Sequence, residues 1–204
     1  MKISPSVEAF VLAGGLSRRM GQDKALLRIK GQSLLEIALA KLPAARIAAA
    51  RSDLSSYAAI VPDLHPGCGP LSGIEAALAA SAALLNLFLP VDLPLLPGRF
   101  LLWMVRRAEV TGALGTIPRI GGRPQPLCAV YHRDLLGPLT ASLLAGEYKV
   151  MPAVCAAARE QVDIFDVERV GAANPEVRGF SSLPLYQWFH NCNTPDDMVG
   201  IEML

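Results

Sequence analysis

The sequence predicts an α/β fold in which helices cover both faces of a mostly parallel sheet. Short apolar runs alternate with helical patterns along the 204 residues, which is the order of elements that builds such a sheet. Hydrophobic residues make up 52% of the chain, as strands buried on both faces require. No repeat, low-complexity segment or linker divides the sequence, so we expect one domain over residues 1–204.

Strands are predicted where apolar runs end in glycine, proline or aspartate. These runs cover residues 7–15, 45–50, 57–61, 86–92, 112–118 and 126–131, and an alternating edge strand follows at 162–167. Because helical patterns separate most of them, we expect right-handed crossovers between parallel neighbours.

Helical spacing is found in five further segments, at residues 33–42, 73–85, 99–110, 134–146 and 150–160. Ser33, followed three residues later by Glu36, is typical of a capping box. Thr194 and Pro195 indicate the start of a last helix. Residues 170–185, rich in glycine, proline and serine, are predicted to form a polar surface loop.

Composition excludes several classes of protein. The net charge of +1 argues against a nucleic-acid-binding surface. The most apolar region, residues 82–105, is interrupted by Asn86, Asp92 and Arg99 before ~18 apolar residues accumulate, so no membrane span is expected. No signal peptide opens the chain, which predicts a cytoplasmic location. The four cysteines and three histidines lack zinc-ligand spacing and are interpreted as structural residues.

The stretch "VLAGGLSRRMGQDKALL", residues 11–27, combines glycines with basic residues after a predicted strand. Gly14 and Gly15 let the main chain approach a ligand and offer N–H groups to anionic oxygens. Arg18, Arg19 and Lys24 supply charge-assisted contacts to phosphate. The pattern is neither a Walker A loop nor GxGxxG. An exposed basic turn is the alternative, but the combination favours a phosphate site.

A second glycine-rich loop, "PDLHPGCGPLSGI" at residues 62–74, leads into a predicted helix. Ligands of open α/β sheets bind where the carboxyl ends of the strands meet, which we call the ligand edge. The prolines and glycines of this loop place a helix N-terminus at that edge. Asp63 is a candidate to accept hydrogen bonds from a base or a ribose. A turn-forming role for this aspartate is an equally good interpretation.

Asp92 follows a buried strand in "LPVDLPLL" and lies between Pro90 and Pro94. An ionised carboxylate at this position needs a neutralising partner. The sequence that follows has no lysine or arginine before Arg99, so the pattern predicts a bound Mg²⁺ that bridges Asp92 to phosphate oxygens.

The segment "FHNCNTPDD", residues 189–197, carries two asparagines in alternation. We interpret Asn191 and Asn193 as residues of a short strand that point the same way, toward the ligand edge.

Taken together, "LAGGLSRRMGQDKALL", "GPLSGI", "PVDLPLL", "GRPQPLCAVY" and "NCNTPDD" resemble, in order and spacing, the molybdenum cofactor guanylyltransferases. The similarity covers nearly the whole chain. It implies a Rossmann-like, three-layer nucleotidyltransferase fold, GTP as donor, Mg²⁺ as cofactor and molybdopterin as the phosphate-bearing acceptor. It also implies molybdenum-enzyme maturation proteins as partners, and neither nucleic acid nor membrane.

The resemblance carries roles onto individual positions. It implies GTP binding by Leu12, Ala13, Gly14, Gly15, Lys24, Asp63 and Asp92, with Asp92 also holding Mg²⁺. From the residues themselves, Lys24, Asp92, Arg18 and Arg19 are the catalytic candidates, and Asn191 and Asn193 are candidates to bind molybdopterin. One departure is "IAAAR" at residues 47–51, where many members carry an asparagine and where Arg51 is the candidate replacement.

Two alternatives stay open on the sequence alone. One is a related nucleotidyltransferase that uses CTP or a different phosphorylated acceptor. The other is a nucleotide-binding module without catalysis, for which "IAAAR" is the only indication, whereas Lys24 and Asp92 favour an enzyme.

Overall fold

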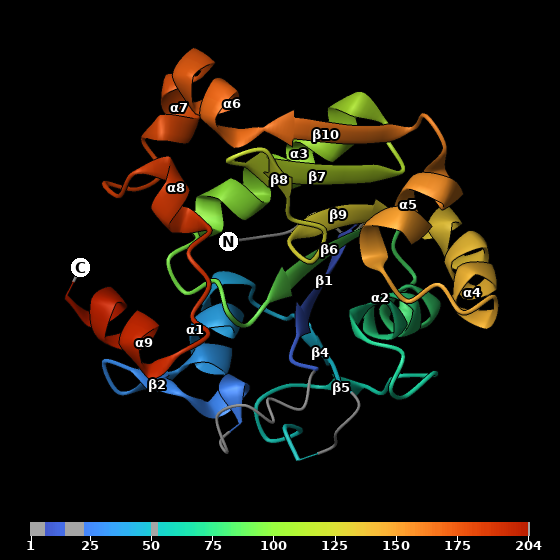
Figure 1. Ribbon diagram of the computed structural model, residues 1–204, viewed down its shortest axis with the longest axis horizontal. Coiled ribbons are helices and arrows are strands. Elements are labelled where there is room, and N and C mark those ends of the chain that lie inside the picture. Colours follow the sequence, from blue (N-terminus) through green and yellow to red (C-terminus); the bar gives the residue numbers. More distant parts are fainter. Residues whose placement is uncertain (1–6, 15–22, 50–52, 204) are drawn as a thin grey trace.

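A computed structural model describes residues 7–14, 23–49 and 53–203. In this part of the chain an eight-stranded sheet has the order β10-β7-β9-β6-β1-β4-β5, with β8 paired to β7 (Figure 1). Its strands are β1 (Val7–Leu12), β4 (Arg46–Ala48), β5 (Ile60–Val61), β6 (Leu85–Pro90), β7 (Gly115–Ile120), β8 (Arg123–Pro124), β9 (Ala129–His132) and β10 (Val162–Asp166).

The sheet is mostly parallel, as predicted. β1 runs parallel to both β4 and β6, β4 to β5, and β10 to β7. β9 is antiparallel to β6 and β7, and β8 is antiparallel to β7. The β1–β6 register pairs Leu12 with Pro90, so the carboxyl ends of these two strands lie at the same edge.

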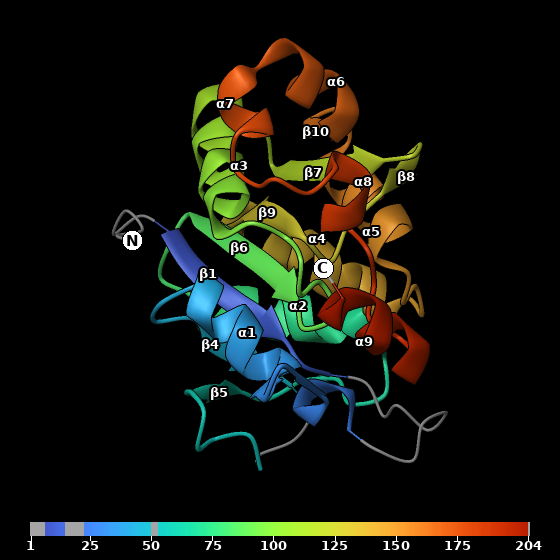
Figure 2. The ribbon, with the colours of Figure 1, turned by 90° about the vertical axis from the view of Figure 1, so that its left-hand side faces the viewer.

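Helices cover both faces of this sheet, which gives three layers (Figures 1 and 2). One face packs against α2, α4 and α5, and the other against α1, α3 and the C-terminal helices. The helices are α1 (Leu34–Lys41), α2 (Pro70–Ala80), α3 (Gly98–Thr111), α4 (Leu136–Leu144), α5 (Val150–Ala158), α6 (Val167–Ala173), α7 (Pro175–Arg178), α8 (Leu185–Trp188) and α9 (Pro195–Glu202).

Alternation along β1 explains the two apolar layers. Val7, Ala9 and Val11 lie in the cluster with α1 and α3, whereas Phe10 and Leu12 lie in the cluster with α2. Successive side chains of a strand point to opposite faces, so a strand buried on both sides must be apolar throughout.

Short elements complete the fold. A 3-10 turn, η1 (Lys24–Leu26), precedes the hairpin of β2 (Arg28–Ile29) and β3 (Gln32–Ser33), and η2 (Arg133–Leu135) precedes α4. The N–H of Lys30 in this hairpin donates to Glu202 Oε1 of α9 at 3.1 Å. Both views show α9 beside β2, so the C-terminus is held against the N-terminal third of the chain (Figures 1 and 2).

Most of the predicted elements are confirmed with small shifts. The capping box of Ser33 and Glu36 forms at the start of α1, and Thr194 caps α9 with Pro195 in its first turn. β10 is the predicted edge strand. The strand predicted at 57–61 is reduced to β5, and the helix predicted at 73–85 begins earlier, at Pro70, and ends at Ala80.

The prediction of a polar loop at residues 170–185 is wrong. α6 extends to Ala173, α7 follows, and α8 begins at Leu185. Asp166 and Asn174 cap α6 and α7 through their side chains, while Val177 and Trp188 are fully buried against the core. The glycines and prolines mark the boundaries of short helices, and the apolar residues between them fix the segment on α3.

In the described residues, no helix is long and apolar enough to cross a membrane.

Candidate active site

The carboxyl ends of β4, β1 and β6 continue their pairing beyond the last residue of each strand. Ala13 N donates to the Ala48 carbonyl at 3.2 Å, and Val91 N donates to the Leu12 carbonyl at 3.3 Å. The chain therefore leaves the sheet at one edge, with Gly14 as the first exposed residue after β1. Ligands of open α/β sheets bind at this edge.

Lys24 joins three segments at this edge. Its Nζ donates to Asp92 Oδ2 at 2.7 Å and to Asn193 Oδ1 at 2.5 Å. The Asp23 side chain accepts from Ala25 N and caps the 3-10 turn that presents the lysine. The contacts span 68 and 169 positions of sequence, so the fold brings the first, third and fourth predicted motifs together.

The C-terminal segment is fixed beside Asp92 by its backbone. Cys192 N donates to the Asp92 carbonyl at 2.9 Å, and the Cys192 side chain is fully buried. Asp197 accepts from Asn193 N and Thr194 N, each at 2.8 Å. These contacts, led by the bond from Asn193 N, lower the pKa of Asp197 below its ordinary value.

The argument that Asp92 has no basic partner is wrong. Lys24, distant in sequence, forms its ion pair, and each side chain of the pair is about one-fifth exposed, at 21% and 23%. A sequence window cannot show a partner that tertiary structure brings in. Asp92 also lies outside α3, whose N-cap is Pro97, so the carboxylate is not a helix cap.

Asp92 nevertheless suits a divalent cation. Its Oδ1 makes no hydrogen bond to any described residue. The amide oxygen of Asn193 lies near the carboxylate, because both accept from Lys24 Nζ. Mg²⁺ commonly takes one or two carboxylates and fills its other positions with phosphate oxygens and water. The donor set therefore fits a magnesium ion that arrives with a phosphate ligand.

A second part of the site lies between β1 and β4. A Cβ built on Gly73 of α2 would meet Asp63 Oδ1 at 3.4 Å, Leu12 Cδ2 at 3.7 Å and Ala48 Cβ at 4.0 Å. The missing side chain thus leaves a hollow of only methyl-group size, bordered by Asp63, Leu12 and Ala48. Sequence reasoning treated Gly73 as a turn residue; its position inside the predicted helix was the available signal.

Asp63 faces this hollow with an unused acceptor. Its Oδ1 is buried and has no hydrogen-bond partner among the described residues. Burial raises the pKa of the Asp63 carboxyl above its ordinary value. A buried acceptor without a donor is costly, so the arrangement suits a ligand that supplies N–H or O–H groups.

The other predicted site residues that the structure describes lie directly after β1 or in the C-terminal segment. Ala13 is buried and Gly14 exposed at the ligand edge, as expected. No strand forms around Asn191 and Asn193, so that prediction is wrong, although both are exposed and flank the buried Cys192. Asn193 reaches Lys24, whereas Asn191 makes no hydrogen bond to the described residues.

Several predictions lie outside the described residues. They concern Gly15, Arg18, Arg19 and Arg51.

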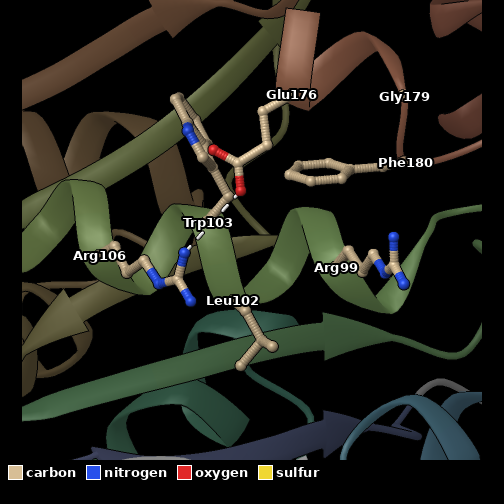
Figure 3. A pocket seen from close by; sticks show the side chains of 7 residues that line it. All are labelled: Arg99, Leu102, Trp103, Arg106, Glu176, Gly179 and Phe180. Carbon is tan, nitrogen blue, oxygen red and sulfur yellow. Dashed lines mark ion pairs between the residues drawn. The ribbon is translucent and has the colours of Figure 1, made fainter.

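A separate pocket of about 300 Å³ lies on the outer side of α3 and shares no residue with the site (Figure 3). Its lining consists of Arg99, Leu102, Trp103, Arg106, Glu176, Gly179 and Phe180. Arg106 Nη1 lies 3.9 Å from Glu176 Oε1 across it. Both side chains of this pair are mostly exposed, so the contact adds little stability.

Comparison with known proteins gives a consistent family. The family model described as "MobA-like NTP transferase domain" matches residues 9–161. The chain is 33% identical over 201 residues to a "probable molybdenum cofactor guanylyltransferase" of Pelotomaculum thermopropionicum, covering 95% of this chain and 91% of that protein. A relative with the same description from Chloroflexus aggregans is 31% identical over 213 residues, covering 99% and 96%.

A solved structure supports the same relationship. The molybdopterin-guanine dinucleotide biosynthesis protein A from Archaeoglobus fulgidus is similar with a TM-score of 0.79 and 27% identity, covering 96% of this chain and 97% of that one.

Proposed function

The chain belongs to the MobA-like NTP transferase family, and from this membership we propose that it transfers GMP from GTP to the terminal phosphate of molybdopterin. The observation that carries the proposal is the meeting of Lys24, Asp92 and Asn193 at the ligand edge of the sheet. Lys24 belongs to the proposed nucleotide motif, and its ammonium contacts both the proposed metal-binding carboxylate of Asp92 and Asn193 of the C-terminal motif. An enzyme that joins two phosphorylated substrates needs such a junction.

The reaction balances without a covalent enzyme intermediate. An oxygen of the terminal phosphate of molybdopterin attacks the α-phosphorus of GTP and forms a new P–O bond. The bond from that phosphorus to the α–β bridging oxygen breaks, and pyrophosphate leaves. For such transfers, positioning and charge neutralisation supply most of the catalysis.

Lys24 is the residue that would balance charge on the reacting phosphates. Its ammonium lies 2.7 Å from Asp92 and can exchange this partner for a phosphate oxygen when nucleotide binds. Gly14 would bring backbone N–H groups close to the triphosphate. Arg18 and Arg19 are proposed as further phosphate ligands from the same motif.

Asp63 is proposed to read the base. Its buried Oδ1, which has no hydrogen-bond partner among the described residues, can accept from N1–H or the exocyclic amine of guanine. Cytosine offers an acceptor in place of N1–H, so a carboxylate there would disfavour it. Because Gly73 has no Cβ, α2 packs closely against Asp63, Leu12 and Ala48.

Asp92 is proposed to hold Mg²⁺, with the Asn193 amide oxygen close by. When bound, the ion would neutralise the triphosphate and polarise its phosphoryl oxygens. Asn191 and Asn193 are proposed to contact molybdopterin from the C-terminal segment. We also propose a cytoplasmic location, and contact with molybdenum-enzyme maturation proteins, which the family resemblance implies.

Pyrophosphate release tests the proposal. We expect release that requires GTP, Mg²⁺ and molybdopterin together, with CTP far less effective. Release with CTP at an equal rate would assign the alternative cytidylyl activity. Nucleotide binding without release in the presence of acceptor would assign the non-catalytic alternative.

A further inference from the structure

A half-buried lysine beside the turn that follows Asp92 has no role in the chemistry described so far. Lys41 is the last residue of α1, and its Nζ donates to the carbonyls of Leu93 at 2.8 Å and Pro94 at 2.7 Å. These are the two residues that follow Asp92. No described carboxylate forms an ion pair with Lys41, so the carbonyls are the partners of its charge.

The segment held by Lys41 is a turn with few other donors. Leu96 N also donates to the Leu93 carbonyl at 3.3 Å, whereas the Pro94 carbonyl has no other donor among the described residues. Leu93 and Leu96 are buried, at 2% and 1% exposed, which draws the turn into the core and away from water. Carbonyl groups in such a turn need a protein donor.

A lysine at the end of a helix ordinarily interacts with the final carbonyls of its own helix. Lys41 reaches across to another segment instead. Burial lowers the pKa of Lys41 to about 8, so the ammonium has exchanged water for protein contacts. Its backbone also packs on the start of α3, since a Cβ on Gly98 would lie 3.6 Å from the Lys41 carbonyl oxygen.

Asp92 is thereby fixed from three sides. Val91, the residue before Asp92, donates its N–H to the Leu12 carbonyl. Cys192 N donates to the carbonyl of Asp92 itself. Lys41 Nζ donates to the carbonyls of the two residues that follow Asp92. The first two contacts are backbone bonds that any sequence could make. The third depends on one side chain.

We propose that Lys41 is a positioning residue that fixes the turn carrying Asp92, so that the carboxylate is placed for the nucleotide and its cation. The proposal rests on the proposed function for the role of Asp92. Misplacement of a catalytic group by about 1 Å can cost on the order of 10²-fold in rate.

Hydrogen exchange tests the anchor in the ligand-free protein. In Lys41→Met, which keeps the aliphatic arm and removes the donors, we expect the amides of residues 91–93, 95 and 96 to exchange about tenfold faster. Lys149→Met is the matched control, because Lys149 is exposed and its side chain forms no hydrogen bond or ion pair with the described residues. Unchanged exchange in Lys41→Met would overturn the proposal.

Kinetics separate positioning from general destabilisation. In an active wild type, we expect Lys41→Met to lower kcat about 10- to 100-fold, with the KM for GTP changed less than about threefold. Lys41→Arg, which keeps a charged donor, should restore most of kcat. Equal kcat in Lys41→Met and wild type, or no recovery in a folded Lys41→Arg, would contradict the inference.

Two provisions keep these outcomes distinct. If Lys41→Met does not fold, Lys41→Leu, which also lacks a donor, replaces it in both measurements, with the same criteria. The exchange measurement needs no substrate, so an inactive wild type would overturn the proposed function while the anchor is still tested by exchange.

Discussion

Lys24 Nζ and Asp92 Oδ2 lie 2.7 Å apart and form an ion pair across 68 positions of sequence. The pair places the proposed phosphate-binding cation on the proposed metal-binding carboxylate in the ligand-free protein. Each group thus neutralises the other until a nucleotide and its cation arrive. Asn193 also accepts from this lysine, so the same ammonium touches the residues proposed to bind the nucleotide and the acceptor.

Lys24→Ala should reduce turnover by about 10²- to 10³-fold, because the developing phosphate charge loses its main cation. Folding should be intact, since the lysine lies at the ligand edge and is partly exposed. Steady-state rates with GTP and molybdopterin, together with a thermal melt, measure both effects. A wild-type rate in the variant would exclude Lys24 from the site.

Asp92→Asn should lose most of the stabilisation that Mg²⁺ and GTP give together, and should be nearly inactive. If Asp92 had no partner in the ligand-free protein, as the sequence suggested, the variant should melt no lower than the wild type. The ion pair with Lys24 revises this to a small decrease, because a partly exposed pair contributes about 0.2–1 kcal/mol. Thermal melts with and without Mg²⁺ and GTP measure each contribution.

A matched control exists for Asp92→Asn. Asp163 pairs with Arg107 at 2.6 Å, away from the ligand edge. Asp163→Asn should lower the ligand-free melting temperature and keep the full response to Mg²⁺ and GTP. A full response in Asp92→Asn as well would place the metal at other ligands.

Gly73→Ala should weaken GTP binding by about tenfold, because the new methyl group would lie 3.4 Å from Asp63 Oδ1 and crowd the proposed base-binding carboxylate. The ligand-free protein should gain up to about 1 kcal/mol, since alanine favours a helix more than glycine does. Gly137→Ala, in α4 with open space around its Cβ, is the control that gains stability alone. Equal GTP affinity in the two variants would remove Gly73 from the nucleotide site.

Asp63→Asn should stabilise the ligand-free protein near neutral pH. Burial raises the pKa of Asp63 above 3.8, so the folded state binds more protons than the unfolded state in the window above that value. The free energy of unfolding of the wild type therefore falls as pH rises through this window. The gain from Asp63→Asn should disappear near pH 3.8 and below. Melting curves of the wild type and Asp63→Asn across this pH range measure the gain. A variant that is less stable than the wild type at neutral pH would contradict the prediction.

Much of the fold could be predicted because β1, β6 and their neighbours are apolar on both faces and punctuated by glycine and proline. The capping patterns at Ser33 and Thr194 also act locally, so the sequence alone locates those helix starts. The helices within residues 170–185 could not be predicted, because α6 and α7 are short and depend on packing against α3 for stability.

The sequence allows the candidate site residues to be chosen, but not the side chains that each of them contacts. Lys24, Asp63, Asp92 and Asn193 stand out by type and position in their loops. Their contacts depend on tertiary structure, and so does the anchor from Lys41, which looks in sequence like any lysine at a helix end.

Transfer of labelled GMP tests the central claim most directly. The wild type would be incubated with α-³²P-labelled GTP, Mg²⁺ and molybdopterin, and Asp92→Asn would be treated in parallel. We predict label on the pterin product in the wild type, in step with pyrophosphate release, and almost none in Asp92→Asn. Label that stays in GTP with the wild type, or equal transfer by Asp92→Asn, would contradict the account.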